Sequence, residues 1–230
     1  LDQDHFSSYA MGHWLRSDSS GRQVRSAVTG ETLGVLGGVP DVAAMRDYAK
    51  SHGGPALRAL NFHDRARMLK ALALHLKAHR KALYDLSFLT GATLADSQID
   101  IDGGIGTLLV YASKGRREMP EGFVLPDGEL EVLSRDGSFL GQHVLTPRQG
   151  ISLQINAFNF PVWGMLEKLA PSLLAGVPSL VKPASDTGYL TQAVVRLIAD
   201  SGILPDGALQ LIMGATGDLL DCLDAQDTVG

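Results

Sequence analysis

The chain has 230 residues, 45% of them hydrophobic, and a formal net charge of −5. This length and composition can bury the core of one large domain or of two small ones. An acidic chain without long basic runs offers no electrostatic surface for nucleic acid or for an anionic membrane, so we expect neither partner. No stretch approaches 18 consecutive apolar residues, and Leu1–Ala10 lacks the pattern of a signal peptide, so we expect a cytoplasmic protein.

Two features of the sequence argue against thiol or metal chemistry within this chain. Its single cysteine, Cys222, excludes an internal disulfide and a cysteine-based metal cage. Cys222 follows Leu219 and Leu220, a setting that favours a small buried side chain over a nucleophile. His75 and His79 could form half of a metal site on a helix, but no third ligand is evident, and we expect no metal.

Short β-prone segments predict a small antiparallel unit at the start of the chain. Thr29-Gly30 is a turn within it, and Pro40-Asp41 then begins a helix that Gly53-Gly54-Pro55 is expected to close. The β-prone segments are 9–14, 22–28 and 33–36.

Two long helices follow. Asn61 is a favourable N-cap for a helix that continues to about Thr90. A second helix is predicted over 96–118, where three glycines, Gly103, Gly104 and Gly106, lower the helix propensity; we expect them to pack closely against a neighbour. Asp100 and Asp102 would face different directions on this helix, which argues against a carboxylate pair. The apolar stripe of the first helix consists of Leu69, Leu72, Leu76, His79, Leu83 and Leu86.

The second half of the chain predicts a hairpin and then an α/β unit. Between 122 and 149, the segments 131–133 and 139–145 are joined by Asp136-Gly137, which is typical of an extended hairpin. From Gly150, strands alternate with helices as in right-handed βαβ units of a parallel sheet. The predicted strands are 151–155, 179–181 and 209–213, and the predicted helices are 161–174, 185–200 and 217–223.

Ligands of open parallel sheets bind beyond the carboxyl ends of the strands. Three segments follow predicted strands in this way: Asn156–Pro161, Lys182–Ser185 and Gly214–Gly217. Each also has an ordinary explanation, as a turn at a helix start, a solvated strand end with an N-cap, or a strand-to-helix turn without the full G-x-G-x-x-G fingerprint.

The order and separation of these segments decide between the explanations. Residues 155–161, 163–171 and 180–185 together resemble the cofactor-domain core of aldehyde dehydrogenases, and the resemblance covers the whole chain. Residues 90–93 and 100–107 are most similar to the aldehyde dehydrogenase half of the bifunctional ring-opening enzymes of phenylacetate degradation.

The resemblance implies an α/β fold, with a Rossmann-like parallel sheet, flanking helices and an antiparallel hairpin. Residues 1–121 would form the N-terminal strands and long helices of the cofactor domain. Residues 122–146 would be an oligomerisation hairpin of a homo-oligomer. Residues 147–230 would be the Rossmann-like cofactor-binding part, incomplete and without the catalytic domain.

The resemblance also implies NAD(P)-dependent oxidation of an aldehyde, in which a cysteine thiolate forms a thiohemiacetal and a glutamate activates water. Asn159 would donate its side-chain amide to the developing oxyanion. Lys168 would lie near the catalytic centre, although a charged cap on an apolar helix explains this lysine equally well. The nucleophile and the base would lie beyond Gly230, so we expect this chain alone to be inactive.

By the same resemblance, Lys182 would bind the ribose or phosphate of the adenosine half of the cofactor. Many NAD-preferring relatives carry glutamate at the position of Ser185, where a carboxylate would repel a 2′-phosphate. Its absence predicts that NADP is accepted at least as well as NAD. The remaining cofactor contacts would come from Asn156, Ala157, Phe158, Gly217 and Asp218, although the glycine turn departs from the commoner family spacing.

The implied substrate is a small-molecule semialdehyde held as a coenzyme A thioester in phenylacetate catabolism. Two alternatives stay open: the semialdehyde dehydrogenase of the benzoyl-CoA epoxidation route, and a catalytically inactive nucleotide-binding or assembly module. Every version requires Asn159 and Lys182 to reach a shared crevice.

Overall fold

A mixed β-sheet forms the centre of the structure, a computed structural model that describes residues 5–16, 21–38 and 40–230. The strand order is β10-β7-β8-β9-β1-β4-β3, and β2 pairs with the outer part of β1. Four strands, β7 (Ser152–Ile155), β8 (Ser179–Lys182), β9 (Leu209–Leu211) and β10 (Thr228–Val229), are mutually parallel.

The predicted βαβ alternation is confirmed for the first two crossovers. Helix α5 (Trp163–Leu174) connects β7 to β8, and α6 (Gly188–Ser201) connects β8 to β9. The helix predicted over 217–223 is wrong. Hydrogen-bonded turns occupy this segment instead of a helix. Bonds such as Asp221 N to Asp218 O close over three residues and do not continue as the ladder of a helix.

The antiparallel pairing predicted at the start of the chain is confirmed, since β1 pairs with β2 and β3 with β4, but these strands are joined to the main sheet. Strand β1 (His5–Ala10) lies inside the main sheet, antiparallel to β9 and parallel to β4 (Thr32–Leu36). The strand predicted over 9–14 is interrupted at Met11-Gly12, where both residues have positive φ and turn the chain into β2 (His13–Arg16). The opening segment 1–4 and residues 17–20 lie outside the described residues, and β3 (Arg22–Arg25) follows, pairing antiparallel with β4.

The glycine-proline segment after the first helix does not stop the helical path. Asp41 caps α1 (Val42–Tyr48), and a π-helical turn at Ala49–Gly53 leads directly into α2 (Gly54–Arg58). Gly53 is needed there because a Cβ atom would lie 2.1 Å from the carbonyl oxygen of Gly207. Pro55 stands in the first turn of α2, where its missing N–H leaves no helical hydrogen bond unmade.

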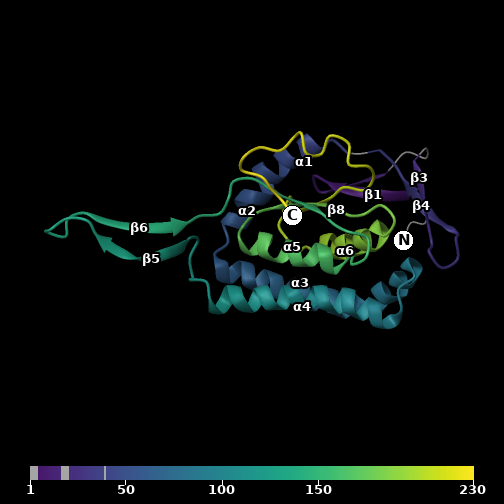
Figure 1. Cartoon of the computed structure of the whole chain (residues 1–230), viewed down its shortest axis with the longest axis horizontal. Helices are drawn as coiled ribbons and strands as arrows, with labels where there is room; N and C mark the ends of the chain where they lie inside the picture. The colour runs from purple at the N-terminus through teal and green to yellow at the C-terminus, as the bar shows by residue number, and fades with distance from the viewer. Residues whose placement is uncertain (1–4, 17–20, 39) are drawn as a thin grey trace.

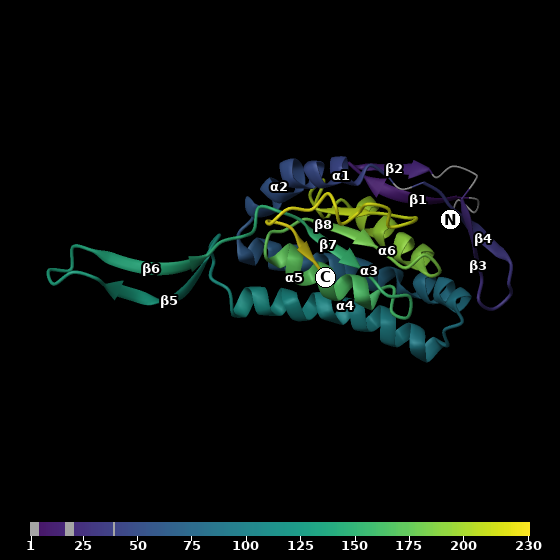
Figure 2. The ribbon, with the colours of Figure 1, turned by 45° about the horizontal axis from the view of Figure 1, so that its top comes forward.

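Helices cover both faces of the sheet in layers (Figures 1 and 2). The α1 side contributes Met45 and Ala49 to a core with Ile151 and Leu180. On the other face lie α5 and α6, and the long helices α3 (Phe62–Ser87) and α4 (Leu94–Arg117) pack outside them. None of the described helices is long and apolar enough to cross a membrane.

The two long helices begin and end near their predicted bounds. Asn61 accepts a hydrogen bond from Asp64 N, and a capping box between Thr93 and Asp96 starts α4. His79 does not belong to the buried stripe: it is exposed, and its Nδ1 lies 2.9 Å from the backbone carbonyl oxygen of His75 on the same helix. Leu69, Leu72, Leu76 and Leu83 are buried, and Leu86 is half-buried.

A two-stranded arm projects from the helical body (Figures 1 and 2). The predicted hairpin is confirmed, although its first strand, β5 (Leu125–Val132), is longer than predicted and shifts register between Asp127 and Glu131. Its partner is β6 (Leu140–Leu145). Several apolar side chains of the arm are exposed, among them Leu130, Val132, Phe139 and Leu145.

Two of the three α4 glycines make the close approach that the sequence predicted. A Cβ atom on Gly103 would lie 2.7 Å from the Trp163 ring, and one on Gly104 would lie 3.0 Å from Trp163 Cα. Gly106 is different, because a Cβ atom there would meet nothing within 4 Å. The first two glycines therefore allow α5 to pack directly on the backbone of α4.

These contacts predict opposite effects of the same substitution on one helix. Gly106→Ala should raise the free energy of unfolding by about 0.5–1 kcal/mol, because alanine favours a helix. Gly103→Ala gains the same propensity but must displace the Trp163 ring, at a cost of about 1–3 kcal/mol. Urea unfolding of both variants measures the difference, and equal stabilisation by both would contradict the packing described here.

Candidate active site

The carboxyl ends of β7, β8 and β9 meet at one edge of the sheet. Ile155 is in register with Lys182, and the next residue, Asn156, donates its backbone N–H to the carbonyl of Lys182 at 3.0 Å. On the far side of β8, Ile212 N donates to Val181 O at 2.8 Å. The loops that leave these three strands therefore start side by side, as the sequence predicted.

The first of these loops, residues 156–161, is fastened to α6. Thr187 Oγ1 donates to Phe158 O at 2.9 Å, and Thr191 Oγ1 donates to Pro161 O at 3.0 Å. Between these two anchors lies Asn159, whose side chain is exposed. The backbone of the loop is thus held in place while the amide of Asn159 stays accessible to a ligand.

Lys168 points from α5 toward the same loop. Its Nζ donates to Asn156 Oδ1 at 2.9 Å and to Gly164 O at 3.1 Å. Because an ammonium only donates, the amide oxygen of Asn156 must face it, and Nδ2 is directed elsewhere. That Nδ2 is buried and has no partner among the described residues, so it is an open hydrogen-bond donor at the sheet edge.

The second loop begins with a buried cation. Lys182 is 5% exposed, its Nζ donates to Pro183 O at 2.6 Å, and burial lowers the pKa of its ammonium. Ser185 is half-buried. The neighbouring carboxylate, Asp186, is exposed and forms an ion pair with Arg22 of β3. A guanidinium therefore compensates the one negative charge next to Ser185.

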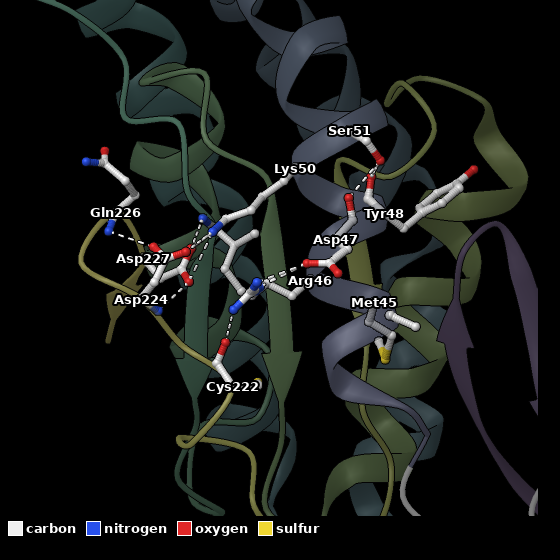
Figure 3. Close-up of polar contacts among 12 residues, drawn as sticks. Met45, Arg46, Asp47, Tyr48, Lys50, Ser51, Cys222, Asp224, Gln226 and Asp227 are labelled. Carbon is white, nitrogen blue, oxygen red and sulfur yellow. Dashed lines mark hydrogen bonds and ion pairs between the residues drawn. The ribbon is translucent and has the colours of Figure 1, made fainter.

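The third loop belongs to the long crossover from β9 to β10. Gly217 and Asp218 are exposed in it. Figure 3 shows how the rest of the crossover is held: Lys50 Nζ pairs with Asp224 at 2.6 Å and with Asp227 at 3.3 Å.

Cys222 lies in the same crossover and is half-buried. Its carbonyl accepts a hydrogen bond from Arg46 (Figure 3), and its Sγ donates to Leu219 O at 3.1 Å. Burial raises the pKa of this thiol, which disfavours the nucleophilic thiolate. Among the described residues, no three His, Cys, Asp or Glu side chains gather as metal ligands. The rings of His75 and His79 lie with their centroids 4.6 Å apart and their planes tilted by 47°.

One functional candidate escaped the sequence analysis. Asp100 of α4, assigned no role above, is 4% exposed and accepts hydrogen bonds from the backbone of α5: Trp163 N at 2.7 Å and Val162 N at 3.2 Å. Burial raises the pKa of its carboxyl to about 6, against the opposing effect of these N–H donors. In the sequence, the one sign of this contact is the position of an aspartate on the buried side of a predicted helix.

A cavity of about 510 Å³ lies away from these loops, at the base of the arm. Its lining includes Phe62, Tyr111, Pro171 and Ser152, the first residue of β7. It therefore opens at the amino end of the parallel strands, and it contains none of the predicted site residues.

Comparison with known proteins identifies the family of this fold and loop arrangement. The model of the aldehyde dehydrogenase family matches residues 14–230. A 3,4-dehydroadipyl-CoA semialdehyde dehydrogenase of Aromatoleum evansii is 41% identical over 224 residues, which are 96% of this chain and 43% of that protein. The chain belongs to the aldehyde dehydrogenase family. It spans less than half the length of the curated relatives it matches.

Solved structures of aldehyde dehydrogenases share the fold. The betaine aldehyde dehydrogenase of Staphylococcus aureus in complex with NAD+ matches with a TM-score of 0.77 at 27% identity, covering 96% of this chain and 42% of that one. An NADP-dependent glyceraldehyde-3-phosphate dehydrogenase of Bacillus halodurans C-125 complexed with NADP matches with a TM-score of 0.80 at 21% identity, a likeness of fold alone, covering 96% and 46% of the two chains.

The buried carboxyl of Asp100 predicts a pH-dependent difference in stability. Because its pKa is raised from 3.8 to about 6, the protonated carboxyl stabilises the folded state. This contribution to stability is fully present below pH 3.8 and is lost as the pH rises through about 6. Asp100→Asn keeps one acceptor oxygen but cannot ionise. The free energy of unfolding of this variant should gain on the wild type by up to about 3 kcal/mol between pH 4 and pH 7. Urea unfolding at both pH values measures this, and a constant difference would contradict it.

Proposed function

We propose that the protein containing this chain is an NAD(P)-dependent dehydrogenase of a coenzyme A-linked semialdehyde. The observation that supports it most is the pairing of β7 with β8, which starts the Asn159 loop directly beside Lys182. A crevice that holds the reacting aldehyde at one end and the nucleoside of the cofactor at the other requires the Asn159 loop and Lys182 to lie side by side. The chain would supply the cofactor site and the oxyanion donor, and the remaining part of the protein would supply the thiol and the general base.

Asn159 would stabilise the oxyanion that develops on the aldehyde oxygen. Its amide donates at any physiological pH without carrying charge, and the bonds from Thr187 and Thr191 fix its loop before substrate arrives. Lys168 would fix the loop's first residue through Asn156, which gives this lysine a positioning role beside the catalytic centre.

The residues at the sheet edge fit a nicotinamide dinucleotide. Lys182 would direct its ammonium to the ribose or phosphate, and the open Nδ2 of Asn156 is a donor for an acceptor atom of the ligand. Backbone at Ala157 and Phe158 would line the adenosine path, and Gly217 and Asp218 the pyrophosphate path. When bound, the nicotinamide would accept the hydride that the substrate loses.

The other parts of the chain would serve the same enzyme. Residues 1–121 and 147–230 would together form the cofactor domain, because β1 of the first part completes the sheet of the second. Residues 122–146 would form an oligomerisation arm, which its exposed apolar side chains support. We further propose a cytoplasmic homo-oligomer without nucleic-acid or membrane partners.

The coenzyme A-linked substrate is supported by the 41% identical relative, which is named a 3,4-dehydroadipyl-CoA semialdehyde dehydrogenase. Two routes stay open for this chain, phenylacetate catabolism and benzoyl-CoA epoxidation, each with its own CoA-linked semialdehyde. Kinetics of the purified full-length protein with both CoA semialdehydes compares the two. Nucleotide binding without oxidation of either would favour the inactive module, as would a gene that encodes no catalytic cysteine and glutamate.

Removing the amide of Asn159 should affect the chemical step alone. We expect Asn159→Ala to lower kcat by about 100- to 1000-fold, because one oxyanion donor is lost. The dissociation constant of NADP and the melting temperature should stay unchanged, since the side chain is exposed and the proposed nucleoside contact is made by Lys182 instead. Steady-state kinetics and calorimetric titration of the full-length protein measure these quantities, and an unaltered kcat would exclude the proposed role.

Adding a carboxylate at position 185 should shift cofactor preference. In Ser185→Glu, repulsion of the 2′-phosphate should weaken NADP binding at least about tenfold, equivalent to ~1.4 kcal/mol. NAD, titrated into the same variant, is the internal control and should bind at least as tightly as before. If the wild-type protein already bound NAD markedly more tightly than NADP, the assignment of Ser185 would be wrong.

A further inference from the structure

The amino end of α5 carries no cap of its own. Val162 stands at the N-cap position and makes no side-chain cap bond, and Pro161 before it has no N–H. Helix starts leave several backbone N–H groups without an intrahelical partner. The first two such groups here, on Val162 and Trp163, are buried or partly buried and need acceptors from elsewhere in the fold.

Asp100 supplies these acceptors from a different helix. Its Oδ1 receives Trp163 N at 2.7 Å and Val162 N at 3.2 Å, and Oδ2 lies 3.3 Å from Val162 N. Hydrogen bonds to a carboxylate are stronger than neutral ones, and the positive end of the α5 dipole favours a negative group at this position. With the side chain 4% exposed, water scarcely competes for either N–H.

A second contact fixes Trp163 against α4. The absence of side chains at Gly103 and Gly104 lets Trp163 pack on the α4 backbone, where a Cβ atom would come within 2.7 to 3.0 Å of it. Asp100 therefore holds the backbone of Trp163, while the glycines one turn further along α4 hold its ring. Together they set where α5 begins.

Asn159 lies between this anchor and a second one. On the α6 side, Thr187 and Thr191 bind the carbonyls of Phe158 and Pro161. On the α4 side, Asp100 binds the N–H groups of the two residues that follow Pro161. The loop that carries the amide is thus held on both flanks, and only the α4 anchor is made by a carboxylate.

We propose that Asp100 is a positioning residue, which acts through the start of α5 to place the amide of Asn159 for oxyanion stabilisation. This inference rests on the proposed function of Asn159. Loss of the carboxylate would free the α5 end of the loop, and displacement of a catalytic group by about 1 Å is enough to cost about 100-fold in rate.

A double-mutant cycle in the full-length protein tests the inference. Asp100→Ala should lower kcat about 100-fold with little change in the dissociation constant of NADP. In the background of Asn159→Ala the same substitution should cost almost nothing further, because Asp100 acts through a group already removed. Asp100→Asn, which keeps the acceptor oxygen, should recover most of kcat. Asp102→Ala is the matched control, since Asp102 binds Tyr84 and does not contact α5.

A second pair of variants covers the case in which Asp100→Ala does not fold. Gly103→Ala pushes on the Trp163 ring and should lower kcat about tenfold, whereas Gly106→Ala on the same helix should leave kcat unchanged. Equal kcat values in these two variants would overturn the inference, as would additive losses in the cycle. If Asn159→Ala alone left kcat intact, the proposed function would fail first, and the two failures are therefore distinguishable.

Discussion

The bonds between Asp100 and the first N–H groups of α5 connect the outer helix α4 to the helical layer that packs on the sheet. A buried carboxylate is costly unless it is well hydrogen-bonded, and a buried helix start is costly unless its N–H groups find acceptors. The carboxylate oxygens of Asp100 accept hydrogen bonds from the N–H groups of Val162 and Trp163 at 2.7 to 3.3 Å, so donors and acceptor are both satisfied. Removing one would leave the other buried without a partner, so the position of α5 against α4 is strongly constrained. The loop that leaves the carboxyl end of β7 leads into α5, so the position of this loop depends on where α5 begins.

At the sheet edge as well, hydrogen bonds fix the backbone while some side-chain groups stay free to bind a ligand. Parallel pairing of β7, β8 and β9 starts three loops side by side, and hydroxyl groups of α6 hold the first of them. Lys168 uses Asn156 Oδ1 and thereby leaves the Asn156 amide nitrogen open. At the far side, Lys50 of the first helical segment holds the crossover from β9 to β10 through two carboxylates.

Several polar groups of this aldehyde dehydrogenase family chain are engaged within the fold. Burial raises the pKa of the Cys222 thiol, and the carboxylates of Asp224 and Asp227 form ion pairs with Lys50. What the chain offers instead is geometry: an exposed amide, an open buried amide donor and a buried ammonium at one edge.

Local patterns in the sequence determined the helices and the parallel unit. An N-cap such as Asn61 or a capping box at Thr93 needs only residues three positions apart, and the loops after β7 and β8 were found because a parallel sheet brings strand ends together. Tertiary structure alone decided the rest. Strand β1 inserts between β9 and β4, residues 217–223 bind side chains of α1 instead of forming a helix, and Asp100 meets α5 across 62 positions of sequence. No local rule could give these results, because each depends on the free energy of burying two segments that are neighbours only after the chain has folded.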